Sequence, residues 1–169
     1  MEFGRPVHIL LVEDDPAHAE IVRRNLADFR VANIITHRED GQAALDYLQD
    51  QEDGVDRDLP DLILLDLRLP KVDGLEVLRR IKDDPELRRI PTVILTTSAA
   101  ERDMLAAYDH GAGSYLVKPV DFAKFTSLLE TFGFYWLAWN RYPPKAPHVG
   151  TGQTPPVHEG DCDDEPANA

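Results

Sequence analysis

The chain has 169 residues, a length that suits one domain, and its 43% hydrophobic and 29% charged residues are typical of a globular protein in water. The 31 acidic and 18 basic residues give a net charge of −13, which argues against a general binder of nucleic acids or anionic membranes. No apolar run approaches the ~20 residues of a membrane span, and no signal-peptide core follows Met1, so we expect a cytoplasmic location. Cys162 is the only cysteine, which excludes a disulfide framework and a cysteine-based zinc site.

Apolar segments typical of strands alternate along the chain with segments whose apolar residues recur at helical spacing. The predicted strands are 7–12, 31–36, 62–65, 91–96 and 114–117. The predicted helices follow them in turn, beginning near Pro16 and Asp40, spanning 72–82 and 99–110, and beginning last after Asp121. Repeated strand–helix units predict an α/β fold, a doubly wound five-stranded parallel sheet with helices on both faces.

Polar side chains follow four of the predicted strands at the point where each strand ends. They are Glu13, Asp14 and Asp15 after the first strand, Asp66 after the third, Thr96, Thr97 and Ser98 after the fourth, and Lys118 after the fifth. In such a sheet these strand ends meet in one crevice, where clustered carboxylates repel each other and suit Mg²⁺. A lysine and a hydroxyl beside them can hold the oxygens of a phosphoryl group in transfer, which makes Asp66 a candidate nucleophile.

With these residues the sequence resembles the receiver domain of two-component response regulators. The matching segments, in the family's order and spacing, are ILLVEDDP (9–16), PDLILLDLRLPKVDG (60–74), PTVILTTSA (91–99) and GAGSYLVKPVDF (111–122). The resemblance covers residues 7–130 and implies a flavodoxin-like sheet of strand order 2-1-3-4-5. It also implies that a partner histidine kinase phosphorylates Asp66.

The resemblance further implies a set of metal ligands. Glu13, Asp14 and Asp66 would hold Mg²⁺, with the backbone carbonyl of Arg68 as a further ligand, whereas Asp15 is not expected to bind directly. Arg68 departs from the smaller or amide side chain that is usual at its position in the family. We hypothesise that its guanidinium alters water access and thereby the phosphoryl lifetime, which the dephosphorylation rate of Arg68→Asn would test.

Switch residues follow from the same resemblance. Thr96 would be the hydroxyl that moves toward the phosphoryl group, and Lys118 the lysine that pairs with that group. Tyr115 would be the aromatic residue whose rotamer reports the state, and Ser98 would serve only to cap the following helix. The peptide between Lys118 and Pro119 is expected to be cis.

The C-terminal part of the last helix is rich in aromatic residues. Six of the chain's thirteen, including both tryptophans, lie within 132–142. A helix packed on its own domain needs only one apolar face, so we predict that this segment forms an interface between two copies. The candidates for this homodimer interface are Phe132, Phe134, Tyr135, Trp136 and Trp139.

Two further features concern partners. The strings LLDLRLP, LTTS and YLVKPVDF, with the aromatic segment, look like single-domain regulators that serve bacterial phytochromes, which implies a histidine kinase of the bacteriophytochrome type as partner. In the family the kinase contacts the first helix and the loop after the last strand. The corresponding residues here are Ala17, His18, Ile21, Val22, Asn25 and Pro119.

The predicted domain organisation is a receiver domain over residues 1–142, including the aromatic extension, followed by a tail over 143–169. The tail has six prolines, five acidic residues and one lysine, and almost no large apolar side chain. Such a composition predicts a flexible segment, because little burial offsets the entropy lost on ordering. It is too short and too acidic for a DNA-binding output domain.

Other classes of protein use parts of this pattern. A phosphatase of the haloacid dehalogenase type needs a second aspartate two residues after the nucleophile, where Arg68 stands. A flavodoxin-like FMN binder needs a phosphate loop rich in glycine and hydroxyl groups after the first strand, where this chain has three acids. A phosphorelay intermediate and an unphosphorylated receiver scaffold remain open alternatives. A receiver would not be an enzyme beyond catalysing its own phosphorylation and dephosphorylation.

Overall fold

Five parallel strands form one sheet with the order β2-β1-β3-β4-β5, which confirms the expected strand order. The computed structural model describes residues 5–49 and 58–145. The strands are β1 (Val7–Val12), β2 (Asn33–Arg38), β3 (Leu62–Leu65), β4 (Thr92–Thr96) and β5 (Ser114–Val117). The helices are α1 (Pro16–Ala27), α2 (Gly41–Gln49), α3 (Gly74–Asp83), α4 (Glu101–Asp109) and α5 (Phe122–Gly133), with a 3-10 turn η1 (Leu87–Arg89) and a π-helical turn η2 (Phe134–Trp139).

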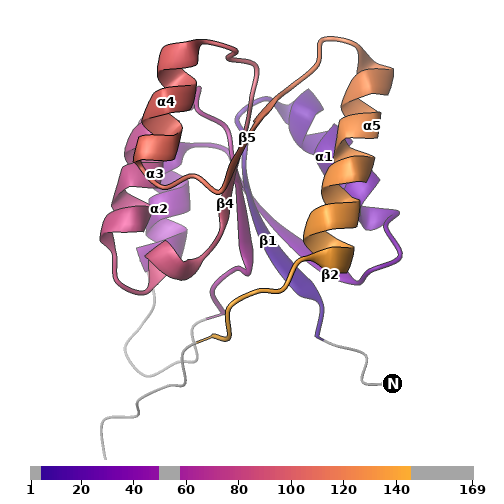
Figure 1. Cartoon of the computed structure of the whole chain (residues 1–169), viewed down its shortest axis with the longest axis horizontal. Coiled ribbons are helices and arrows are strands. Elements are labelled where there is room, and N and C mark those ends of the chain that lie inside the picture. Colours follow the sequence, from indigo (N-terminus) through magenta and orange to yellow (C-terminus); the bar gives the residue numbers. More distant parts are fainter. Residues whose placement is uncertain (1–4, 50–57, 146–169) are drawn as a thin grey trace, which may run out of the picture.

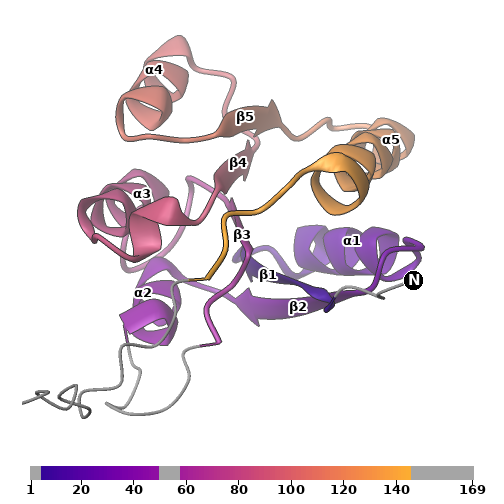
Figure 2. The ribbon, with the colours of Figure 1, turned by 60° about the horizontal axis from the view of Figure 1, so that its bottom comes forward.

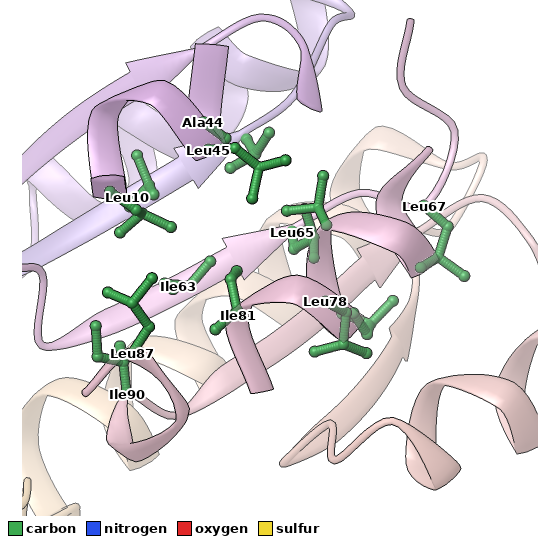
Figure 3. Packing of buried hydrophobic residues seen from close by; sticks show 14 of the residues in the cluster. Leu10, Ala44, Leu45, Ile63, Leu65, Leu67, Leu78, Ile81, Leu87 and Ile90 are labelled. Atoms are coloured by element: carbon green, nitrogen blue, oxygen red, sulfur yellow. The ribbon is translucent and has the colours of Figure 1, made fainter. Parts of the chain in front are cut away.

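The sheet separates two layers of helices (Figures 1 and 2). Helices α1 and α5 cover one face, and α2, α3 and α4 cover the other. Side chains alternate between the faces: Leu10 and Val12 pack with the α2–α4 layer, and Ile9 and Leu11 pack with α1 and α5. Figure 3 shows the first of these two buried clusters between the sheet and its helices. Each central strand is therefore apolar on both faces, as expected for a parallel sheet covered on both sides.

Polar side chains move some boundaries from their expected positions. Strand β2 begins at Asn33 instead of residue 31, because the Asn33 side chain donates to the carbonyls of Leu26 and Val31 and ends the preceding turn. Helix α3 begins at Gly74 instead of residue 72, because the Asp73 carboxylate accepts from the amide of Leu75 and caps the helix. None of the helices that the described ranges contain is long and apolar enough to cross a membrane.

The aromatic segment divides into two groups. Phe132 is 4% exposed and belongs to the core under α1 and α5, because it continues the apolar face of Phe125 and Leu129. Its predicted place in a dimer interface is therefore wrong. Trp136 is half-buried against the same core, and the hydroxyl of Tyr142 donates to its carbonyl. The exposed members are Phe134, Tyr135 and Trp139. Beyond residue 145 the expected tail lies outside the described residues.

Candidate functional site

The loop after β1 presents three acids at the carboxyl end of the sheet. Asp15 caps α1, since its Oδ1 accepts from the amides of Ala17 at 2.8 Å and His18 at 3.3 Å. Glu13 is buried, and its Oε1 accepts from the amide of Asp15 at 3.1 Å. Asp14 is exposed to solvent. The three neighbours thus differ in role, and Asp15 acts as a helix cap.

Asp66 lies at the same edge, directly after β3. Its amide donates to the carbonyl of Val12 at 3.0 Å, which holds the end of β3 against the end of β1. Gly74, at the start of α3, packs so closely that a Cβ there would stand 2.2 Å from the carbonyl oxygen of Asp66. The backbone around Asp66 is therefore fixed on two sides, and the residue is 5% exposed.

Glu13, Asp14 and Asp66 form one acidic cluster, as the sequence predicts. Each offers a carboxylate oxygen, and these oxygens lie within 4.8 Å of one another. Three carboxylates without a cysteine or histidine form a donor set that fits a hard divalent cation such as Mg²⁺. With all three ionised and one ammonium group beside them, the cluster carries a net charge of −2, which a divalent cation would balance.

Lys118 brings a buried positive charge to this cluster. Its ammonium donates to Glu13 Oε2 and, at 2.8 Å, to Asp66 Oδ2. Its third close neighbour is His18 Nδ1 at 3.1 Å. The sequence pattern indicated Lys118 but gave His18 only as part of a kinase-contacting face. The signal that was missed is its position one helical turn beyond the acids, which brings the ring over the cluster.

Burial is the main factor that raises the pKa of Glu13 to about 7, from its ordinary value of 4.5. The neighbouring Lys118 ammonium opposes this rise, and the negative charge of Asp66 adds to it. A buried carboxyl group with this pKa changes charge near neutral pH.

The ends of β4 and β5 bring the hydroxyl side chains to the site. Thr96 is buried, and its Oγ1 accepts from the amide of Ser98 at 3.3 Å. The hydroxyl of Tyr115 donates to the carbonyl of Ser98 at 2.9 Å, so the ring is directed toward the loop between β4 and α4. The expectation of a cis peptide before Pro119 is wrong: with a trans peptide the amide of Lys118 donates to the carbonyl of Thr96 at 2.7 Å, and the ammonium still reaches the acids.

Arg68 links the Asp66 loop to α4. Its amide donates to Asp66 Oδ1 at 3.1 Å, and its guanidinium donates to Asp103 Oδ2 at 2.8 Å. Ser98 Oγ donates to the same Asp103 oxygen at 2.6 Å, so Ser98 does more than cap a helix. Nothing in the sequence pattern singled out Asp103.

The face of α1 that was predicted to contact a kinase needs one correction. Val22 is fully buried in the core, because it lies on the side of α1 that packs on the sheet. It is therefore unavailable for a partner. The other predicted residues of α1 and Pro119 are exposed or half-buried.

Comparison with known proteins identifies relatives of the whole arrangement. The family model of the response regulator receiver domain matches residues 9–130. The chain is 47% identical over 146 residues to the probable methanogenesis regulatory protein FilR2 of Methanothrix harundinacea, in a match that covers 86% of this chain and 94% of FilR2. It is 40% identical over 136 residues to the response regulator Rcp1 of Synechocystis, covering 80% of this chain and 92% of Rcp1.

Solved structures of response regulators also resemble this chain. The phosphorylated cyanobacterial phytochrome response regulator RcpA superimposes with a TM-score of 0.77 at 37% identity, covering 82% of this chain and 99% of RcpA. The Mn²⁺-bound form of Rcp1 superimposes with a TM-score of 0.78 at 39% identity, covering 82% of this chain and 100% of Rcp1.

Proposed function

Because the chain belongs to the family of response regulator receiver domains, we propose that it is a stand-alone cytoplasmic response regulator that accepts a phosphoryl group on Asp66 from a histidine kinase. The observation that carries this proposal is the buried Lys118 ammonium between Glu13 and Asp66. An ammonium held there neutralises charge where a phosphoryl group would arrive. Two relatives that the chain matches over 94% and 92% of their own length support a stand-alone role.

The chemistry is a phosphoryl transfer from nitrogen to oxygen. A carboxylate oxygen of Asp66 forms a bond to phosphorus as the bond from phosphorus to the donor's imidazole nitrogen breaks, and the imidazole keeps the electron pair. The two Asp66 oxygens are oriented by the amide of Arg68 and the ammonium of Lys118. Attack of water on phosphorus later releases inorganic phosphate and restores the carboxylate.

We propose that Glu13, Asp14 and Asp66 hold Mg²⁺, with the backbone carbonyl of Arg68 as a further ligand. When bound, the ion supplies positive charge to the oxygens of the phosphoryl group. The relative Rcp1 has been solved in a Mn²⁺-bound form, which supports the binding of a divalent cation by this chain. We further propose that Thr96 moves toward the phosphoryl group and that Tyr115 responds to this movement.

Binding of Mg²⁺ is expected to strengthen about tenfold from pH 6 to pH 8, because one proton must leave Glu13, whose pKa is raised to about 7. The same raised pKa makes the metal-free protein lose stability as the pH rises from about 4.5 to 7, since the folded state holds the proton more tightly than the unfolded chain. Calorimetric titration with Mg²⁺ at pH 6, 7 and 8 measures the first effect. Glu13→Gln, which keeps an oxygen but does not titrate, should remove the pH dependence; an unchanged slope in this variant contradicts the assignment.

Incubation with acetyl phosphate and Mg²⁺, followed by intact-mass measurement, tests the function directly. We expect one base-labile phosphoryl adduct on the wild-type protein and none on Asp66→Asn, because the amide is a poor nucleophile. Thr97→Ala is a matched control, since it changes an exposed residue of the neighbouring strand end. Absence of the adduct from the wild type would favour an unphosphorylated scaffold, and catalytic turnover of phosphoesters would favour a phosphatase.

We also propose that the kinase is a bacteriophytochrome and that the protein is a homodimer. The first proposal is supported by RcpA, a cyanobacterial phytochrome response regulator of 37% identity. A phosphotransfer comparison between a bacteriophytochrome kinase and an unrelated histidine kinase tests it, and equal transfer rates would contradict it. The second is supported by the exposed aromatic side chains of Phe134, Tyr135 and Trp139.

A further inference from the structure

Arg68 contacts two parts of the molecule, the loop that carries Asp66 and helix α4. Its backbone amide donates to the Asp66 carboxylate, and its guanidinium donates to Asp103 on α4. The Arg68 side chain is 57% exposed, whereas that of Asp103 is 10% exposed. A partly exposed arginine is held weakly by a single carboxylate, because solvent screens the pair. The contact between Arg68 and Asp103 is therefore one that a stronger anion can replace.

The first turn of α4 depends on the contact between Arg68 and Asp103, because this helix has no side-chain cap at its N-cap residue. The N-cap residue, Ala100, has no side chain that can accept from the free amides of the first turn. Asp103 in that first turn is instead held from outside the helix, by Arg68 and by the hydroxyl of Ser98. By contrast, α1, α3 and α5 are each capped by an aspartate of their own.

A phosphoryl group on Asp66 would be such a stronger anion. It carries a charge between −1.5 and −2 at about neutral pH and offers three acceptor oxygens. It would be attached to a side chain that already accepts from the Arg68 amide, and so would stand beside the residue whose guanidinium binds Asp103. Asp103 would keep the hydrogen bond from the Ser98 hydroxyl and its favourable place at a helix N-terminus, so its carboxylate would still be stabilised after the exchange.

We propose that Arg68 is a latch between the phosphoacceptor loop and α4. In the unphosphorylated protein its guanidinium holds Asp103 and thereby the first turn of α4. Phosphorylation of Asp66 draws the guanidinium to the phosphoryl group and releases that turn. This inference rests on the proposed phosphorylation of Asp66 and adds the element that responds to it.

The released turn is directly connected to the other switch residues. Ser98 donates to Asp103 through its hydroxyl, accepts from the Tyr115 hydroxyl through its carbonyl, and donates to Thr96 through its amide. These contacts form a continuous chain from Asp103 to β4 and β5. Loss of the Arg68 contact would therefore change the loop between β4 and α4 together with the first turn of α4.

Hydrogen exchange measured by mass spectrometry on peptides covering residues 99–107 tests the latch in the full chain. We expect phosphorylation by acetyl phosphate and Mg²⁺ to speed exchange there about two- to fivefold in the wild type, the effect of losing one partly exposed ion pair. Arg68→Met should exchange at the faster rate without phosphorylation and respond little to it. Arg68→Lys, which keeps a cation, should restore the wild-type response.

Two further variants separate the latch from a general loss of charge. Asp103→Asn should show the same hydrogen-exchange rate as Arg68→Met. The double variant that carries both substitutions should show this rate as well, because the two residues act through one contact. Arg24→Met removes an exposed arginine paired with Glu20 on α1 and should behave like the wild type.

The outcomes distinguish the two proposals. A phosphoryl adduct on Arg68→Met with a full wild-type change in exchange would overturn the latch and leave the proposed function intact. Equal exchange of the unphosphorylated wild type and Arg68→Met would overturn it as well. A wild-type protein that forms no adduct would overturn the proposed function, and the comparison of the two unphosphorylated proteins would still decide whether Arg68 holds α4.

Discussion

Replacement of Lys118 by methionine is expected to destabilise the metal-free protein by about 3–5 kcal/mol at neutral pH. Lys118 is 4% exposed, and its ammonium is in contact with the carboxylates of Glu13 and Asp66, both of which are buried. Methionine has a similar shape but no charge, so it would leave two buried carboxylates without a cation. The loss of stability should grow as the pH rises, because protonation of Glu13 relieves its repulsion with Asp66. The pKa of Glu13 is already raised to about 7, so this relief disappears above neutral pH.

Mg²⁺ should recover much of this stability. A divalent cation bound by the three carboxylates replaces the missing positive charge. Because the ion binds only the folded state, it also stabilises that state. Urea denaturation with and without Mg²⁺ measures the effect, which should be larger in Lys118→Met than in the wild type.

Lys82→Met is the matched control for this experiment. The Lys82 ammonium is also partly buried, but it donates to the backbone carbonyls of Arg88 and Ile90, away from the acids. Its loss should cost about 1–3 kcal/mol and should not depend on Mg²⁺. Equal Mg²⁺ dependence of the two variants would contradict a special role for Lys118 in the acidic cluster.

The same Lys118 variant should lose phosphorylation even where Mg²⁺ restores its fold. Removal of one group that stabilises developing charge lowers rates by about 10²–10³-fold. The rate of adduct formation with acetyl phosphate, measured on protein that is folded at high Mg²⁺, separates this effect from stability. A wild-type rate in the folded variant would mean that Lys118 serves only to neutralise the acids.

The strand ends could be predicted because the chemistry there follows directly from the chain. Continuous apolar runs ended at Val12 and Leu65, and the polar residues that came next had to meet at one edge of a parallel sheet. His18 and Asp103 could not be predicted in this way. Each lies within a helix, and its role depends on the angle at which that helix packs against the sheet.

The aromatic segment shows a different limit of sequence reasoning. Its composition gave the number of rings but not which of them face the core. That depends on the register of α5, which places Phe132 with Phe125 and Leu129, and on the π-helical turn that follows. A π-turn changes the spacing of side chains, so a pattern based on ordinary helical spacing cannot assign Trp136 and Trp139.

Phe132→Ala and Trp139→Ala are therefore expected to affect different properties. Phe132 is fully enclosed by its own domain, so its truncation should lower the free energy of unfolding by about 3–5 kcal/mol and the Tm by roughly 10 °C. Trp139 is 73% exposed, so its truncation should change stability by less than about 1 kcal/mol. Thermal unfolding, measured at a protein concentration low enough for the protein to be monomeric, gives both changes in stability.

Trp139→Ala should instead shift a homodimer toward monomer, because an exposed tryptophan is the kind of side chain that dominates an interface. Light scattering at micromolar concentration gives the mass of each variant. Ile34→Ala is the control, since Ile34 is also exposed but lies on β2. A monomeric wild type would contradict the dimer, and a dimer that survives Trp139→Ala would direct attention to Phe134 and Tyr135. Loss of the dimer in Phe132→Ala but not in Trp139→Ala would mean that the dimer depends on the stability of the core beneath α5 and not on the exposed Trp139 side chain.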